Sequence, residues 1–261
     1  MFINNINRLN EAARWMSLAR KTVALTGAGV STESGIPDFR SENGLWTRFP
    51  PGEYATLGAF HRHPQKVWQM LTELEGLLDA QPNAGHLALA ALEREGALAG
   101  IVTQNIDGLH QAAGSRTVVE FHGNGHTFTC LRCNERFSRQ RVTLMPRKGA
   151  IPHPPDCAQG QCLLKPDVVF FDEQIPGDAI VGTERLLAGA DLVIVAGTSC
   201  EVYPAAEIPF QVRRQGGKVI EINLEPAMDL QPDLLLQGAF GQVMPRLLEA
   251  WRSTRNDVQV S

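Results

Sequence analysis

The segment TVALTGAGVSTESGIPDFR, residues 22–40, joins a short apolar run to a glycine-rich turn. The run Thr22–Leu25 has the length and composition of a strand, and Gly27 and Gly29 follow it. A strand followed by Gly-x-Gly is where a doubly wound sheet holds a dinucleotide, because the glycines let the backbone approach the phosphates and its amides then donate to them. Glycines also form ordinary tight turns, so the turn by itself leaves both interpretations open.

The same segment departs from the fingerprint of dehydrogenases. The third glycine would fall at Thr32, and no strand that ends in an acidic residue follows at the usual distance. Pro37 discourages a long helix directly after the turn. These departures disfavour hydride transfer, while dinucleotide binding remains the expectation. Arg40 is then a candidate partner for a phosphate or a ribose, with a surface salt bridge as the simpler alternative.

Helix-like and strand-like segments alternate along most of the chain. Helices are predicted over Asn7–Arg20, Pro64–Leu78, Asn83–Glu95, Asp178–Ala188 and Pro204–Gln215. Besides Thr22–Leu25, strands are predicted over Gly100–Thr103, Thr117–Phe121, Asp167–Phe171, Asp191–Ala196 and Lys218–Ile222. This alternation predicts an α/β fold with a mostly parallel, buried sheet that carries helices on both faces.

Length and charge narrow the class of protein. With 261 residues and a formal net charge of −4, the chain suits one large domain, or one large and one small. It has no long basic run, so we expect no direct binding of nucleic acid. The segment Met1–Asn10 is polar, and no apolar stretch is long enough for a bilayer. We expect a cytoplasmic monomer that binds no membrane.

Four of the five cysteines cluster in a region with little helical periodicity. Cys130-x-x-Cys133 has the knuckle spacing of tetrahedral zinc, and Cys157 and Cys162 supply a looser second pair. Four-sulfur sites are usually structural, so we assign no catalysis to the metal. His126 and His153 are rival ligands, and four unrelated buried cysteines are the alternative. The fifth, Cys200, is expected to be a partly buried neighbour of the nucleotide rather than a nucleophile.

A second polar cluster follows the predicted strand Gly100–Thr103. Polar side chains at the carboxyl end of a parallel strand point into the ligand crevice, so Asn105 and Asp107 could bind an amide and a ribose. The alternative is that both simply cap the next helix. His122 also follows a predicted strand and could serve as a general base, although a lone histidine is more often structural.

Taken in order, these motifs resemble the signatures of the sirtuin family. The first is GAGVSTESGIPDFR, residues 27–40, the second is TQNID, residues 103–107, and the third is His122-Gly123. Cys130-x-x-Cys133, Gly197-Thr198-Ser199 and Asn223-Leu224-Glu225 continue the resemblance, which spans about residues 22–248. The long first motif is far more specific than a lone Gly-x-Gly.

The resemblance implies a fold of three parts. A Rossmann-type domain would comprise residues 1–36, 84–125 and 166–261. A cofactor loop and helical insertion would comprise residues 37–83, and a zinc-binding module residues 126–165. NAD and an acyl-lysine protein or peptide would bind in the cleft between these parts, and Zn²⁺ would be structural.

The resemblance also assigns roles to individual residues. His122, Asn105 and Asp107 would be catalytic, with His122 as the base. The loop residues that contact NAD would be Gly27, Ala28, Gly29, Ser31, Thr32, Asp38, Phe39, Arg40 and Trp46. Gln104, Asn105, Ile106 and Asp107 would hold the nicotinamide and its ribose. The adenosine side would be lined by Gly197, Thr198, Ser199, Asn223, Leu224, Glu225 and Ala239.

The implied activity is NAD-dependent removal of acyl groups from protein lysines. The acyl oxygen would attack C1′ of the nicotinamide ribose, and the products would be nicotinamide, O-acyl-ADP-ribose and free lysine. A mono-ADP-ribosyltransferase or NAD glycohydrolase on the same scaffold is the rival enzyme, which the presence of His122 disfavours. A non-catalytic NAD sensor is the second alternative.

Two departures concern the substrate. Family members that remove succinyl groups carry a Tyr-x-x-Arg pair, and Leu71 and Leu74 stand at those positions here. Neither can bind a carboxylate, so we expect acetyl or longer uncharged acyl groups, unless both leucines are ordinary helix core. The stretch Val168, Val169 and Phe170 resembles the strand that pairs with substrate backbone. Asp172 follows it where a glycine is usual.

Overall fold

A six-stranded parallel sheet forms the centre of the computed structural model, which describes residues 2–39, 41–42, 44–74, 80–142, 163–227 and 229–260, with backbone alone at 2–5, 74, 141 and 256–260. The strand order is β3-β2-β1-β7-β8-β9. The strands are β1 (Thr22–Thr26), β2 (Ile101–Thr103), β3 (Val118–Glu120), β7 (Leu192–Ala196), β8 (Lys218–Asn223) and β9 (Leu234–Gln237). This order is that of a Rossmann fold, so the predicted α/β fold is confirmed.

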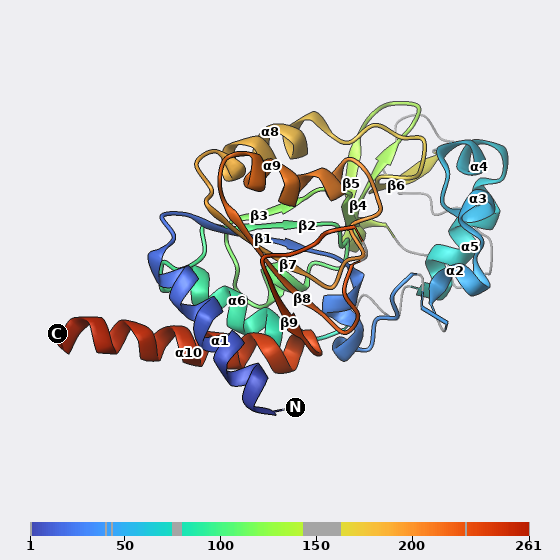
Figure 1. The fold of residues 1–261 in the computed structure, drawn as a ribbon. Coiled ribbons are helices and arrows are strands. Elements are labelled where there is room, and N and C mark those ends of the chain that lie inside the picture. Colours follow the sequence, from blue (N-terminus) through green and yellow to red (C-terminus); the bar gives the residue numbers. More distant parts are fainter. Residues whose placement is uncertain are drawn as a thin grey trace.

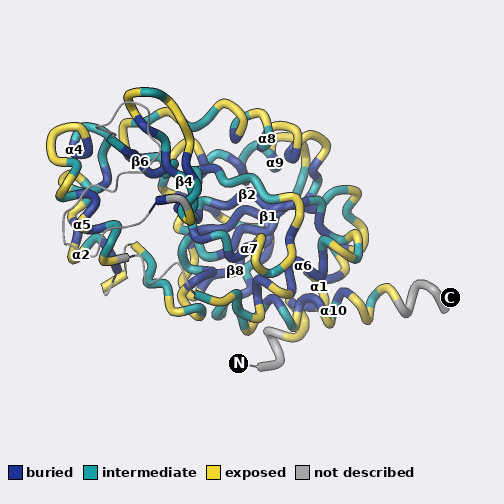
Figure 2. Tube along the Cα trace, turned by 180° about the vertical axis from the view of Figure 1, so that it is seen from behind, coloured by how far each residue is buried: buried dark blue, intermediate teal, exposed yellow. Residues whose placement is uncertain are grey.

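The sheet is buried on both faces, and its side chains alternate between two hydrophobic clusters. Val23 and Leu25 of β1 join the cluster on one face, whereas Ala24 joins the cluster on the other. Each strand of a parallel sheet covered by helices is apolar on both sides, which is why these runs lack a polar face. Figure 2 shows that the buried chain is concentrated in these strands and in the helix faces next to them.

Helices cover both faces of the sheet, as Figure 1 shows. On one face lie α1 (Phe2–Leu18), α6 (Ala84–Arg94) and α10 (Phe240–Val260), and on the other lie α8 (Gly177–Leu187) and α9 (Ile208–Arg214), which follows the 3₁₀ turn η4 (Ala205–Glu207). Asn83 caps α6 by accepting from the amides of Gly85 and His86, as its position predicted. None of the helices in the described ranges is long and apolar enough to cross a membrane.

A smaller unit lies beside the carboxyl edge of the main sheet (Figure 1). It contains a three-stranded antiparallel sheet in the order β5-β4-β6, formed by β4 (Gly123–Cys130), β5 (Arg136–Ser138) and β6 (Leu164–Val168), with the short turn η3 (Arg139–Arg141). Next to it pack α2 (Leu45–Arg48), α3 (Pro51–Tyr54), α4 (Leu57–Arg62) and α5 (Pro64–Leu74). A third hydrophobic cluster, which includes Phe60, Trp68 and Phe128, joins the helices to this sheet.

Several predicted elements need correction. The strand expected over Asp167–Phe171 is wrong in extent, because β6 begins at Leu164, ends at Val168 and pairs antiparallel with β4. Phe171 leaves that sheet and forms a parallel bridge with Thr56 of the helical insertion. The expected boundary between residues 165 and 166 thus falls inside β6, while the division into three parts stays a prediction. The end of the helix expected to reach Leu78 lies outside the described residues.

Candidate active site at the carboxyl edge of the sheet

The strand order reverses between β1 and β7, because β2 and β3 are added on one side of β1 and β7, β8 and β9 on the other. The loops that follow β1 and β7 meet at this point. After β1 the chain enters the 3₁₀ helix η1 (Ala28–Ser34), and after β7 it turns at Gly197. The amide of Gly27 donates to the carbonyl oxygen of Ala196 at 3.0 Å, and the amide of Gly29 donates to that of Gly197 at 2.9 Å. Strand ends at such a switch point form the ligand crevice of doubly wound sheets.

The glycines of this loop allow it to pack closely on the end of β7. The amides of Gly27 and Gly29 donate to that end of the sheet, so donation to phosphates by the other amides of the loop stays a prediction. A Cβ on Gly27 would lie 2.7 Å from the Cβ of Thr198, and a Cβ on Gly197 would lie 2.3 Å from the amide nitrogen of Val30. Glycine is required here because two loops pack backbone to backbone.

Ser31, Asn105 and Asp107 form one buried network. The Ser31 hydroxyl donates to Oδ2 of Asp107 at 2.7 Å and accepts from Nδ2 of Asn105 at 3.1 Å. Asp107 also accepts from the Leu109 amide, at the start of the short helix α7 (Leu109–Ala112). Asp107 thus binds the first amide of α7, whose N-cap residue is Gly108, and the same carboxylate binds Ser31. Three polar side chains predicted to bind the ligand lie together.

Thr198 is the centre of the hydrogen bonds among the residues that were predicted to line the adenosine side. Gln104 Nε2 donates to the Thr198 hydroxyl at 3.0 Å, and Asn223 Nδ2 donates to its carbonyl oxygen at 3.0 Å. Asn223 is held in turn by Glu221, which is fully buried in β8 and also accepts from the Ala227 amide. Glu221 was missed, although a glutamate inside an apolar strand is a visible signal.

Cys200 follows this turn and is buried, as expected. Burial raises the pKa of its thiol to about 12, and the nearby Glu221 adds to the shift. A thiol with that pKa stays protonated at neutral pH, which is unsuitable for a nucleophile.

His122 lies between the sheet and the small unit. Its Nδ1 is 3.2 Å from the carbonyl oxygen of Gln104. Because a carbonyl can only accept, Nδ1 carries the proton, and the lone pair of the neutral ring is on Nε2. Burial lowers the pKa of His122, so the ring is neutral at physiological pH. The contact with Gln104 therefore defines Nε2 as the nitrogen with the lone pair, and the role of His122 as a base stays a prediction.

The loop after η1 is folded back on itself. The amides of Leu45 and Trp46 donate to the carbonyl oxygens of Asp38 and Phe39, and the Phe39 and Trp46 rings are in contact, tilted by 30° with centroids 4.9 Å apart. Phe39 remains 36% exposed, so it is available to a ligand. Arg40 lies outside the described residues.

Other predicted site residues occupy the rim. Thr32 fastens the turn by donating to the Gly29 carbonyl. Ile106 accepts from the Gly125 amide, which joins the second polar cluster to β4. Leu224, Glu225 and Ser199 are exposed beyond the strand ends, and Ala239 lies just before α10. The structure places these residues near the carboxyl edge, and their contacts with NAD stay predictions.

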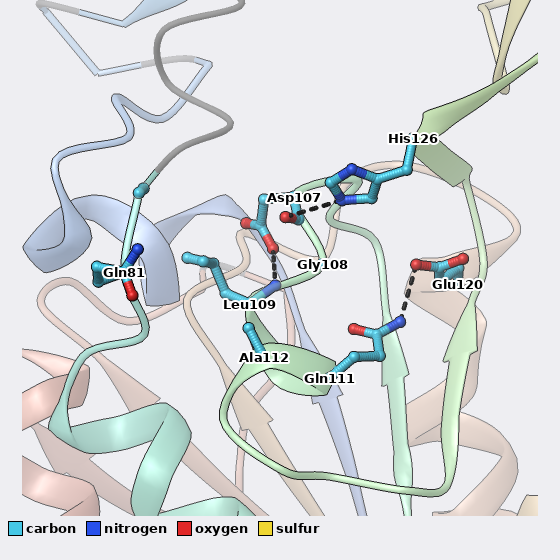
Figure 3. A pocket seen from close by; sticks show the side chains of 9 residues that line it. Gln81, Asp107, Gly108, Leu109, Gln111, Ala112, Glu120 and His126 are labelled. Carbon is cyan, nitrogen blue, oxygen red and sulfur yellow. Dashed lines mark hydrogen bonds between the residues drawn. The ribbon is translucent and has the colours of Figure 1, made fainter. Parts of the chain in front are cut away.

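A cavity of about 580 Å³ adjoins Asp107 (Figure 3). Gly108, Gln111, Glu120 and His126 line it, and His126 Nε2 lies 3.2 Å from the Asp107 carbonyl oxygen. Burial raises the pKa of Glu120, which accepts from Gln111 at 2.8 Å. His122 and Gln104 are not part of its lining, so the cavity lies next to the reaction centre rather than at it.

Half of the predicted metal site is described. Cys130 is fully buried at the end of β4, and Cys133 follows in a turn. Burial raises the pKa of the Cys130 thiol, but backbone amides that include that of Cys133 outweigh it and hold the pKa below its usual value. A cysteine that accepts amide hydrogen bonds as a thiolate suits a zinc knuckle. Cys157, Cys162 and the rival His153 lie outside the described residues.

The predicted substrate segments lie where β6 meets the insertion. The Val169 amide donates to the His122 carbonyl at 2.9 Å, so Val168 and Phe170 present their backbone groups to the opposite edge. There Lys165 Nζ donates to the Val168 carbonyl at 2.8 Å, and the Phe170 amide donates to Glu173 at 2.9 Å.

Leu71 is half-buried against the third hydrophobic cluster, to which Phe170 also belongs. The side chain of Leu74 lies outside the described part of the structure. Asp172 has a φ of 65°, a left-handed conformation that glycine adopts readily and that aspartate can also adopt.

Comparison with known proteins agrees with this geometry. A model of the Sir2 family matches residues 27–204. The NAD-dependent protein deacylase of Thermococcus kodakarensis is 45% identical over 246 residues, which cover 92% of this chain and 94% of that protein.

Two solved structures share the fold over nearly their whole length. A mutant Sir2 homologue in complex with ADP ribose has a TM-score of 0.85 and 40% identity, covering 94% of this chain and 97% of its own. A Sir2 complex with a p53 peptide and NAD+ has a TM-score of 0.79 and 37% identity, covering 92% and 96%. The chain therefore belongs to the Sir2 family.

Proposed function

We propose that the protein is an NAD-dependent protein-lysine deacylase. The observation that carries this proposal is the grouping of Asn105, Asp107 and His122 beside the loops that meet at the β1–β7 switch point. A dinucleotide bound at the switch point would extend toward these three residues. The products would be nicotinamide, O-acyl-ADP-ribose and the free lysine.

The polar network would orient the nicotinamide end of NAD. Asn105 carries a second amide proton and a carbonyl oxygen beyond its bond to Ser31, and these can bind a carboxamide. Asp107 would offset the positive charge of the nicotinamide ring, and its own position is fixed by Ser31 and Leu109. Bond cleavage would profit from this preorganised arrangement because the groups need not move during reaction. NAD supplies the ribose C1′ that the acyl oxygen attacks.

His122 would act as the general base. Its Nδ1–H is bound by the Gln104 carbonyl, so Nε2 is the atom that takes a proton from a ribose hydroxyl. The lowered pKa keeps this nitrogen unprotonated near neutral pH. Deprotonation of the ribose would allow its 2′-oxygen to attack the acyl carbon. The lysine amine would then leave as its C–N bond breaks, and water would open the resulting ring to give O-acyl-ADP-ribose. A hydrolase of NAD alone does not require this second step.

The acyl-lysine peptide would bind along the backbone edge of Val168–Phe170 that faces away from His122. In the structure that edge is covered by side chains, because Lys165 bonds the Val168 carbonyl and Glu173 bonds the Phe170 amide. Lys165 and Glu173 also form an ion pair of 3.0 Å. A peptide strand that pairs here would exchange these contacts for its own backbone hydrogen bonds.

The acyl pocket would favour uncharged groups. Leu71 packs against the cluster that contains Phe170, and an aliphatic wall offers no partner to a carboxylate. We therefore expect acetyl-lysine or longer uncharged acyl-lysine to react much faster than succinyl-lysine. Comparable kcat/KM values for acetyl and succinyl peptides of one sequence would refute the assignment of Leu71 and Leu74 to this pocket.

The zinc ion would be structural. Cys130 and Cys133 would supply two thiolates, and Cys157 and Cys162 the other two. The buried Cys130 with its amide hydrogen bonds fits this role, and bound zinc would fasten β4 to the chain between β5 and β6. No catalytic role is assigned to the metal.

One experiment tests the proposal against its rivals. The protein is incubated with NAD and a panel of acyl-lysine peptides, and deacylated peptide, nicotinamide and O-acyl-ADP-ribose are quantified. A deacylase yields the three in equal amounts, and His122→Ala abolishes deacylation while the fold is retained. Nicotinamide without deacylated peptide would indicate a glycohydrolase or ADP-ribosyltransferase. NAD binding without turnover would indicate a sensor.

A further inference from the structure

Two buried histidines outside the reaction centre lie side by side behind it. His86 of α6 and His110 of α7 are 0% and 1% exposed, and their ring centroids are 4.9 Å apart. One nitrogen of each ring, Nε2 of His86 and Nδ1 of His110, finds no hydrogen-bond partner within the described part of the chain. Buried polar atoms without a partner are costly, so this pair calls for a physical account.

The partners of the other two nitrogens define the proton on each ring. His86 Nδ1 accepts from the Asn83 amide at 3.3 Å, so the neutral ring carries its proton on Nε2. The Thr26 hydroxyl gives its only proton to Thr103 at 2.9 Å and therefore accepts from His110 Nε2, which lies at 2.9 Å. His110 thus has its proton on Nε2 and a lone pair on Nδ1. The two unpartnered atoms are one donor and one acceptor.

We infer that one buried water accepts from His86 Nε2–H and donates to His110 Nδ1, and that the pair positions the proposed nicotinamide site. The resulting chain of hydrogen bonds runs from His86 through His110 and Thr26 to Thr103, whose hydroxyl also accepts from the Asn105 amide at 3.1 Å. It therefore connects the start of α6 to the backbone of a residue in the proposed reaction centre. This inference rests on the proposed function.

The first end of the chain is also anchored to the nucleotide loop. Asn83 donates through Nδ2 to the Val30 carbonyl at 2.8 Å and to the Ser34 hydroxyl at 3.1 Å. The histidine pair thus spans from η1 on one side to the start of the TQNID segment on the other. The proposed nicotinamide site has residues on both segments, so it requires that their relative position be fixed.

The chain works only while both rings are neutral. Protonation of His110 would remove the lone pair that accepts from the water and break the link. Burial lowers the pKa of His86 to about 4, and burial together with the nearby His86 lowers the pKa of His110 to about 3. Asp107 raises the pKa of His86, but burial outweighs it. At neutral pH the link is therefore intact.

The direct test is the tautomer of each ring, which does not depend on activity. Long-range ¹⁵N–¹H correlation spectra of the full-length protein at pH 7 should show both His86 and His110 as the neutral Nε2–H form. Assignment uses the spectra of His86→Asn and His110→Gln. An Nδ1–H tautomer at His110, or a charged ring at either site, would overturn the inference even if deacylation were confirmed.

A pair of substitutions tests the positioning role. In His110→Gln the amide nitrogen stands near Nε2 and keeps the bond to Thr26, whereas in His110→Asn it stands near Nδ1 and loses that bond. We expect His110→Asn to lower kcat/KM for NAD about ten-fold, the effect of one lost buried hydrogen bond, and His110→Gln to stay within about three-fold of wild type. KM and kcat are measured separately with acyl peptide saturating.

The melting temperatures of the variants show whether His110 positions the site or only stabilises the fold. Thr183→Val is the matched control, because Thr183 is buried on α8, on the far face of the sheet, and its hydroxyl has no partner among the residues that the structure describes. It should leave kcat/KM unchanged. Equal losses of activity in His110→Asn and His110→Gln, or a loss that tracks only the fall in melting temperature, would refute the role. A wild type that deacylates nothing would instead refute the proposed function.

Discussion

The amide of Gly29 donates to the carbonyl oxygen of Gly197 across 2.9 Å, and this bond fixes the relative position of the two loops at the switch point. Because both partners are backbone, no side chain separates the loops, and the Ala28–Ser34 turn lies directly on the end of β7. The shape of the nucleotide site therefore depends on glycine at positions where any Cβ would force the loops apart.

Gly197→Ala should disrupt this arrangement. The new Cβ would lie 2.3 Å from the Val30 amide nitrogen, and the residue has a φ of 60° that alanine rarely adopts. We expect the free energy of unfolding to fall by about 1–3 kcal/mol and ADP-ribose binding to be lost. Urea unfolding and calorimetric titration measure the two effects. Gly177→Ala is the control, since no described atom lies within 4 Å of its Cβ; equal behaviour of the two variants would contradict the packing argument.

Ser31→Ala should damage catalysis more than stability. It leaves Oδ2 of Asp107 and an amide proton of Asn105 without their shared buried partner. Each lost bond of this kind costs about 1–3 kcal/mol, which corresponds to a fall of about 10- to 100-fold in kcat/KM for NAD. Steady-state kinetics at saturating peptide measure it. The helix-surface variant Ser17→Ala should match wild type, and an unimpaired Ser31→Ala would rule out the network as an orienting device.

The pH profile of deacylation should reflect His122. The base is active when neutral, and burial lowers its pKa below the ordinary value of 6.5. Activity is then lost only as the pH falls through this lowered pKa, so the acid limb of kcat/KM has its midpoint below 6.5. Rates between pH 5 and 8.5 at subsaturating NAD give the profile. An acid midpoint at or above 6.5 would be inconsistent with the neutral, buried ring.

Local signals in the sequence predicted five of the six strands of the main sheet but not the edge strand β9. β1 and β7 are mainly apolar runs, β8 has apolar residues at Val219, Ile220 and Ile222, and the cap at Asn83 depends only on its neighbours, so these elements could be predicted. The edge strand β9 is four residues long, and α10 contains Pro245, which hides its helical pattern. The predicted bounds of β6 were wrong because the bounds depend on its pairing with β4, which its own composition does not indicate.

The same contrast holds in the candidate site. Side chains on the motif loops, such as Asn105 and His122, could be predicted because their residue types and positions after strands indicate the chemistry. His110 and Glu221 support the site from behind and were missed. Their partners are set by the fold: His110 contacts Thr26, 84 residues away.

Removal of zinc should destabilise the protein. Elemental analysis should find about one zinc ion per chain, and a strong chelator should lower the melting temperature. Cys130→Ser should bind no zinc and melt early, because the buried Cys130 is the proposed ligand at the end of β4. Cys200→Ala should keep its zinc. A metal-free preparation that melts like the loaded protein would eliminate a structural site.

Acid should unfold the protein through its buried histidines. Burial lowers the pKa values of His86 and His110 in the folded state to about 4 and about 3, whereas unfolded histidine titrates near about 6.5. Below pH 6.5 the unfolded chain binds protons that the folded chain does not, so stability falls as the pH falls, until the folded pKa values are reached. The combined loss at pH 4 is on the order of 6 kcal/mol, which is comparable to the whole stability of many domains.

The contribution of His110 can be measured from the slope of the unfolding free energy against pH, by comparing wild type with His110→Gln. Each buried neutral histidine adds about 1.4 kcal/mol per pH unit between its two pKa values. His122 also makes stability fall as the pH falls, because burial lowers its pKa. Glu120 has the opposite effect on stability, because burial raises the pKa of its carboxyl group. Urea unfolding from pH 7.5 to 4.5 should therefore give a slope about one proton smaller in His110→Gln than in wild type. His61→Gln, at an exposed position, should leave the slope unchanged. If His110→Gln kept the full slope, His110 would titrate alike in both states, and its buried neutral form would be excluded.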